Sequence, residues 1–336
     1  MEIKQRDYYI DNVRGLATLS VIFIHTVFWS GVFYVPDYMR IAALFFDVPV
    51  FFLLTGFVFK STGKIDSLRQ SVKIAYYFFV FTLIMNTLTF NLNIDQLIGA
   101  ITFNSANIPV FPVVNGSYWF VPMYISSIII AHALIKTLGE KTKFIIPMAL
   151  LYYFVGYFAD YKLHYTMLGI NINSLLFYVS LILVGYNFYG LIGKRKSFIY
   201  LAIFFILFIL LINYNNDAIR LQKYKLNLSL PYVLASSISV AFIFTGLLTR
   251  KKSLLSWIGQ RAIYFYMAQG IGASVIYIVV HKLKLDWIPK LLIMFSINLA
   301  VTFIVVTSIL KIISMTETLC SRKFFTGPRA GLPVKH

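Results

Sequence analysis

Ten long apolar segments, separated by short polar stretches, run through the sequence from end to end. Most of them approach the roughly 20 residues that a helix needs to cross the hydrocarbon core of a bilayer. Hydrophobic residues make up 59% of the chain and charged residues 12%, against roughly 25% charged residues in soluble domains. The sequence therefore predicts an all-α, polytopic membrane protein with about ten transmembrane helices. The segments lie near 13–33, 41–59, 74–91, 118–138, 144–159, 174–192, 198–213, 230–248, 262–281 and 288–313.

Lysine and arginine are distributed unevenly between the two sides of the predicted membrane. When the amino terminus is placed in the cytoplasm, that side holds 22 of the 30 basic residues, as the positive-inside rule expects. An even number of helices then puts both termini in the cytoplasm. This topology explains the net charge of +18 without a nucleic-acid partner. The basic clusters at 194–196 and 250–252 are interpreted as membrane anchors, with contact to anionic lipids as a second interpretation.

The segments form one predicted integral-membrane domain over 1–315, followed by a short basic cytoplasmic tail over 316–336. The single cysteine, Cys320, excludes a disulfide framework and a multi-cysteine metal site. No two histidines share the spacing of metal ligands. The sequence therefore predicts no metal site, and no pattern in it indicates an oligomeric state.

The first apolar segment carries two ionisable residues, Arg14 at its cytoplasmic end and His25 near its middle. Such side chains are costly at membrane depth and usually face a cavity or a partner. A separation of eleven residues puts them within about 20° of one helix face and roughly 16 Å apart along the axis. A neutral imidazole accepts a proton from a hydroxyl, and an arginine binds phosphate bidentately, which suggests a donor site open to the cytoplasm. Taken alone, these residues are explained more simply by an interhelical hydrogen bond of His25 and snorkelling of Arg14.

Two aspartates lie close to this pair. Asp47 falls a few residues inside the second segment from the external side, at nearly the depth of His25 if the first two helices form a hairpin. A carboxylate there would orient His25 and raise its basicity, whereas a helix cap at the interface is the alternative interpretation. Asp11 precedes Arg14 by three residues, so an i,i+3 ion pair that orients the arginine is expected.

Four stretches of the sequence resemble the acyltransferase 3 family of bacterial integral-membrane O-acyltransferases. RGLATLSVIFIH at 14–25 is similar to the family's pattern of Arg, ten residues and His in the first transmembrane helix. VPVFFLLTGFVF at 48–59 resembles its aromatic-rich segment, and SYWFVPMYISSII at 117–129 resembles its Trp-Phe-Leu helix start. SWIGQRAIYFYMAQ at 256–269 resembles its carboxyl-terminal Trp-Leu-Gly segment. The four matches follow the family's order across most of the chain.

The resemblance implies transfer of an acyl group, usually acetyl, from cytoplasmic acyl-CoA to a sugar hydroxyl. The acceptor would be a surface polysaccharide or its lipid-linked precursor, and the enzyme would lie in the bacterial cytoplasmic (inner) membrane. The matching Arg and His are required for function in the family, so the resemblance implies that Arg14 and His25 are required here. His25 would act as general base, or alternatively carry the acyl group covalently. No fused SGNH domain is expected in this chain.

The sequence also departs from the family pattern. The loop KSTGKIDSLRQSVK has one arginine, Arg69, with Lys73 four residues later, where the family often has Arg-x-x-Arg. Arg69 and Lys73 are therefore candidates for binding the donor phosphates. Gln269 and Ala262 stand where the family often has His and Ser, so neither receives a proton-transfer role.

Aromatic residues at the start of the fourth segment are candidates for the acceptor side. Tyr118 and Trp119 would stack on a sugar or an adenine, although an interfacial aromatic belt predicts them equally well. The long Asn-rich connection over 91–117 is a second place to expect acceptor contacts. The alternative function is a transporter or flippase of lipid-linked sugars, but the sequence lacks the internal repeat that transporters commonly show.

Overall fold

The computed structural model describes residues 7–29, 34–63, 67–90, 94–101, 111–117, 119–159, 166–167, 170–225 and 228–324. The described chain is almost entirely helical, apart from one antiparallel pair of two-residue strands, β1 (Thr166–Met167) and β2 (Ile170–Asn171). The α-helices are α1 (Tyr8–Trp29), α2 (Asp37–Phe45), α3 (Pro49–Thr62), α4 (Ser67–Leu88), α5 (Ile94–Ile101), α6 (Pro112–Ser117), α7 (Phe120–Leu138), α8 (Ile145–Phe158), α9 (Ile172–Phe188), α10 (Arg195–Tyr214), α11 (Leu221–Lys225), α12 (Leu230–Phe244), α13 (Leu254–Gln260), α14 (Ala262–Val279) and α15 (Trp287–Phe324). Four short 3-10 turns complete the elements, η1 (Gly139–Phe144), η2 (Tyr189–Leu191), η3 (Asn216–Ile219) and η4 (Val280–Lys282).

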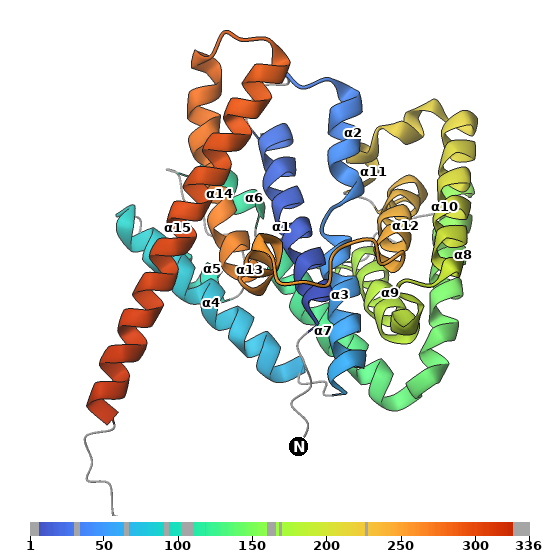
Figure 1. Cartoon of the computed structure of the whole chain (residues 1–336), viewed down its shortest axis with the longest axis horizontal. Helices are drawn as coiled ribbons and strands as arrows, with labels where there is room; N and C mark the ends of the chain where they lie inside the picture. The colour runs from blue at the N-terminus through green and yellow to red at the C-terminus, as the bar shows by residue number, and fades with distance from the viewer. Residues whose placement is uncertain are drawn as a thin grey trace, which may run out of the picture.

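The all-helical class of the fold is confirmed, and every predicted apolar segment overlaps a helix. Within the described residues, seven helical stretches are long and apolar enough to cross a membrane, and α12 is a shorter apolar helix. One of the seven, Phe120–Phe158, contains both α7 and α8, between which the chain changes direction at η1 (Figure 1). The number of ten spans and the cytoplasmic position of both termini stay predictions. Helix α15 continues past the predicted domain boundary at 315, as far as Phe324.

Helix α1 lies near the centre of the molecule, with α13, α14 and α15 on one side and α3, α9 and α12 on the other (Figure 1). Its apolar residues enter three separate parts of the core. Val13 and Ala17 pack with α3 and α9, Ile24 packs with α2, α10 and α12, and Ile22 packs with α14 and α15. A helix that is apolar on nearly every side is buried in this way, so α1 touches most of the bundle.

The second apolar segment is broken rather than continuous. Helix α2 ends at Phe45 and α3 begins at Pro49, because proline lacks an N–H and fits the first helical position. Backbone carbonyls freed at a break inside a membrane need new donors. The Ser239 hydroxyl donates to the carbonyl of Phe45 and the Ser20 hydroxyl to that of Phe46. The unwound residues between α2 and α3 include Asp47.

Helix α13 packs very closely on α1. A Cβ atom added to Gly259 would lie 2.8 Å from the backbone nitrogen of Gly15, and one added to Gly15 would lie 2.7 Å from the backbone carbonyl carbon of Leu255. Asn12 strengthens the contact, because its amide donates to the carbonyls of Thr249 and Lys251 at 2.7 and 2.9 Å. The first and fourth stretches that carry the family resemblance are therefore in direct contact.

Candidate active site

A cavity of about 950 Å³ opens beside the amino-terminal half of α1. It runs along α3 from Thr62 to Val48, a distance of about 20 Å at 1.5 Å per residue. The charged residues gather in its outer part, next to Tyr8, Tyr77 and Tyr189, and its inner part is mostly apolar and aromatic. The outer residues include Asp7, Asp11, Arg14, Ser61, Thr62, Gln70, Lys73, Arg250 and Gln260, and the inner residues include Val21, Val48, Phe51, Thr55, Phe120, Val121, Tyr124, Ile263, Tyr266 and Met267.

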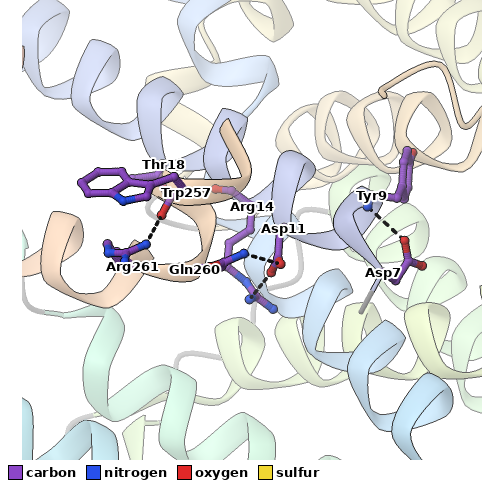
Figure 2. A network of polar contacts seen from close by, with 8 residues as sticks. All are labelled: Asp7, Tyr9, Asp11, Arg14, Thr18, Trp257, Gln260 and Arg261. Carbon is purple, nitrogen blue, oxygen red and sulfur yellow. Dashed lines mark hydrogen bonds and ion pairs between the residues drawn. The ribbon is translucent and has the colours of Figure 1, made fainter. Parts of the chain in front are cut away.

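Arg14 lies at the mouth of this cavity, held by a polar group from two helices. Its Nη1 is 3.6 Å from Oδ1 of Asp11, so the predicted i,i+3 ion pair is present in the structure. The other carboxylate oxygen of Asp11 accepts a hydrogen bond from Nε2 of Gln260 at 3.2 Å (Figure 2). Arg14 lines the cavity, so the guanidinium donors that Asp11 does not engage can reach a ligand there.

Two further cations line the mouth, and one predicted cation does not. Lys73 reaches it from α4, and Arg250 reaches it from the chain between α12 and α13, where its guanidinium lies 5.7 Å from the centre of the Tyr9 ring. Arg69 is exposed and is not among the residues that line the cavity. The structure therefore brings Lys73 together with Arg14, but not Arg69.

The inner end of the cavity is formed by side chains from α1, α3 and α7. Thr55 and Tyr124 share a hydrogen bond of 2.6 Å between their hydroxyls. Val21 lies on the same stripe of α1 as Arg14, and His25 follows Val21 by one helical turn. Val48 is the chain neighbour of Asp47. His25 and Asp47 thus lie just beyond the innermost residues of the cavity rather than on its wall.

The His25 ring is partly exposed, but its Nδ1 atom is buried and has no hydrogen-bond partner among the described residues. The ring stacks on Trp29 with 6.2 Å between their centres. Two charged groups, Lys225 and Asp47, are close enough to act on the imidazole electrostatically. A buried nitrogen without a partner is costly, and the Nδ1 atom of His25 is such an atom among the described residues.

Asp47 has different partners from those expected. Its side chain is only 2% exposed, and its Oδ2 atom lies 2.5 Å from Nζ of Lys225 and accepts a 2.8 Å hydrogen bond from the Tyr232 hydroxyl. No hydrogen bond joins Asp47 to His25 in the described part of the chain. Asp47 acts on His25 through charge at a distance, and its position in the break between α2 and α3 differs from the helix-cap alternative.

Trp119 and Gln269 are not among the residues that line the cavity. Trp119 is exposed and does not line the cavity, but its ring lies 6.1 Å from that of Tyr178, on which Asp47 acts electrostatically. Tyr118 lies outside the described residues. Gln269 is buried in α14, and neither polar atom of its side chain has a partner among the described residues. No group of three or more His, Cys, Asp or Glu side chains able to hold a metal occurs in the described ranges.

Lys225, Tyr232 and Arg250 belong to these sites and were not singled out in the sequence. In the sequence, Lys225 stands among other cations in a polar stretch between two apolar segments, and Arg250 stands in the basic cluster at 250–252. Tyr232 follows a proline at the start of an apolar helix, and nothing in the pattern marks it. Their roles depend on packing between helices that are distant in the sequence.

The described chain is thus a bundle of apolar helices with a cavity that has cations at one end and a histidine just beyond the other. A family model described as an acyltransferase domain, that of the acyltransferase 3 family, matches residues 7–307 of this chain. The chain therefore belongs to the acyltransferase 3 family and is a membrane acyltransferase. No curated protein and no solved structure matches it significantly.

Proposed function

We propose that this protein is an O-acyltransferase that moves a short acyl group, most simply acetyl, from acyl-CoA to a sugar hydroxyl. The acceptor is a surface polysaccharide or its lipid-linked precursor, and the protein acts in the bacterial cytoplasmic membrane. One observation carries this proposal: the cavity begins among Arg14, Lys73 and Arg250 and ends at Val21 and Val48, next to His25.

The dimensions and charge of the cavity fit an acyl-CoA donor. Arginine and lysine side chains at the mouth bind the phosphates of the nucleotide part, Arg14 by its planar fork and Lys73 as a point charge. The apolar interior accepts the flexible arm, whose thioester then reaches the inner end, near His25. Because three cations and two carboxylates, Asp7 and Asp11, line the mouth, its net charge favours an anion.

The reaction follows from the position of His25. Its neutral imidazole takes the proton of the acceptor hydroxyl as the hydroxyl oxygen bonds to the thioester carbonyl carbon. The π electron pair of the carbonyl moves onto the carbonyl oxygen, which becomes an oxyanion. The oxyanion then re-forms the carbonyl and expels the CoA thiolate, which takes the proton from His25. In the alternative order, His25 attacks the thioester first and carries the acyl group to the acceptor.

The test compares the O-acetyl content of cell-surface glycans, by mass spectrometry, in a host that lacks the gene and in the same host carrying variants. His25→Gln should leave the glycans unacetylated, as the deletion does. The matched control is His132→Gln, because His132 lies outside the cavity and bonds to Ser67 at 2.5 Å. That variant should restore acetylation.

Two results would contradict the proposal. Normal acetylation with His25→Gln would remove the histidine from the reaction. Loss of glycan export with unchanged acetylation would favour the transporter, which family membership does not favour. Purified protein incubated with radiolabelled acetyl-CoA separates the two orders of reaction, because only a covalent relay leaves label on the protein when no acceptor is added.

A further inference from the structure

A buried charged cluster lies at the break between α2 and α3, and the proposed reaction has not yet used it. Lys225, on the short helix α11, reaches Asp47 at 2.5 Å, and Tyr232, on α12, donates to the same carboxylate oxygen at 2.8 Å. The Lys225 side chain is 18% exposed, whereas that of Asp47 is 2% exposed. The Lys225 side chain is therefore the more exposed member of the pair.

The cluster keeps unused hydrogen-bonding capacity. A lysine ammonium has three N–H donors, and the structure gives Lys225 one partner, Asp47, among the described residues. Helix α1 passes close to this cluster, because Ser20 of α1 bonds to the carbonyl of Phe46, the chain neighbour of Asp47. One helical turn or so further along α1, His25 has a buried Nδ1 with no partner among the described residues. Spare donors beside a spare acceptor are the chemical complement of a carbonyl oxygen beside a hydroxyl group.

We propose that Lys225 is the catalytic cation of the acyl transfer, stabilising the oxyanion that forms on the thioester carbonyl while His25 accepts the proton of the acceptor hydroxyl. This inference rests on the proposed function and names the oxyanion-stabilising group. The new bond joins the hydroxyl oxygen to the carbonyl carbon, the carbonyl electron pair moves onto its oxygen, and the Lys225 N–H donors bind that oxygen. When the carbonyl re-forms and the thiolate leaves, Lys225 is unchanged.

Asp47 and Tyr232 have a positioning role in this arrangement. Asp47 holds the ammonium by an ion pair, and the Tyr232 hydroxyl fixes the carboxylate. A preorganised donor costs no rearrangement when the oxyanion forms, which is why such donors contribute strongly to catalysis. Lys225 and Asp47 act electrostatically on His25 with opposite signs, so the carboxylate offsets part of the repulsion between the ammonium group and the imidazolium that exists after proton transfer.

The experiment measures the rate of acetyl transfer from acetyl-CoA to the endogenous acceptor in membranes that contain each variant at known amounts. Lys225→Met should lower kcat by about 10²- to 10³-fold, the usual effect of removing one oxyanion donor, with an unchanged KM for acetyl-CoA. Lys225→Arg keeps the charge and should recover much of the rate. The matched control is Lys223→Met, because Lys223 lies on the same helix, is exposed, and pairs with Asp217 at 3.2 Å; its kcat should equal that of wild type.

A purely structural ion pair is distinguished by a second comparison. Removing one member of a buried pair destabilises a protein because the other charge is left uncompensated. In Asp47→Asn the ammonium of Lys225 is the charge left uncompensated, and adding Lys225→Met removes it. The double variant should therefore have a higher melting temperature than Asp47→Asn and a lower transfer rate. An equal or higher rate in the double variant would overturn the inference. If Asp47→Asn has no measurable rate, equal rates in Lys225→Arg and Lys225→Met overturn it instead.

Different results would contradict the proposed function and the assignment of Lys225. If wild-type membranes transfer no acetyl group, or if His25→Gln is fully active, the proposed function is wrong. If His25→Gln is inactive while Lys225→Met has the kcat of wild type, the acyltransfer proposal stands and the assignment of Lys225 is wrong.

Discussion

The contact between α1 and α13 allows a quantitative prediction for Gly259→Ala. The added methyl group would lie 2.8 Å from the nitrogen of Gly15 and 2.9 Å from the carbonyl carbon of Asp11. Favourable contacts of carbon atoms lie at about 3.5–4.0 Å. The carbonyl oxygen of Asp11 lies closer still. Since all these neighbours are backbone atoms, no side chain can rotate away, and the two helices must separate by more than about 0.7 Å.

This separation has two consequences. Forcing an extra methyl group into a packed interface costs about 1–3 kcal/mol of stability, so the melting temperature should fall. The shift also moves Gln260, the neighbour of Gly259, away from Asp11, which it reaches at 3.2 Å. Arg14 then loses its support, and because misplacement by about 1 Å can cost 10²-fold in rate, donor affinity and transfer should both decrease.

The assay is thermal unfolding of the purified protein in lipid nanodiscs, followed by titration with acetyl-CoA. Gly190→Ala is the matched control, because a methyl group there meets no atom within 4 Å. The control should have the melting temperature and the acetyl-CoA affinity of wild type. Equal values of both quantities for Gly259→Ala and Gly190→Ala would refute the close packing of α13 on α1.

Further predictions concern the two ends of the site. Lys73→Ala should weaken acetyl-CoA binding and Arg69→Ala should not, since of these two residues only Lys73 lines the cavity. Calorimetric titration of both variants measures the affinities. Equal losses of affinity would argue against the cavity as the donor site. Tyr232→Phe removes a hydrogen bond to Asp47 and should cost about 1.5–3 kcal/mol of stability. Its transfer rate should fall much less than that of Lys225→Met, because the ion pair remains; an equally large loss of rate would contradict the positioning role.

Much of the fold follows from the sequence, because apolar length alone indicates helices that span a membrane. The bounds of α7, α8, α10 and α14 lie within a few residues of the predicted segments. The predicted segment 41–59 runs across the break between α2 and α3, where Pro49 begins α3. In the sequence a proline at a helix start cannot be told from a kink inside a continuous helix, and only the supporting hydroxyls of Ser20 and Ser239 make the break stable.

The candidate site was predictable where it follows from one helix and not where several helices meet. The stripe from Arg14 towards His25 follows from helix geometry, and so does the ion pair with Asp11. The partners of Asp47 do not, because Lys225 lies 178 positions away in the sequence and no local pattern links them. Charge pairing between distant elements is decided by packing, which apolar periodicity does not encode.

The central claim is that an acyl-CoA donor occupies the cavity whose mouth is formed by Arg14. Protection of an introduced cysteine tests it most directly. Cys320 is first changed to serine, and Val58→Cys then places one thiol on the cavity wall, while Lys194→Cys provides an exposed control. The rate of labelling by a small methanethiosulfonate reagent is measured with and without acetyl-CoA.

Acetyl-CoA should slow the labelling of Val58→Cys and leave Lys194→Cys unchanged. Adding Arg14→Ala should abolish the protection at the same donor concentration. Labelling of Val58→Cys at the same rate with and without saturating acetyl-CoA would contradict the assignment of this cavity as the donor site.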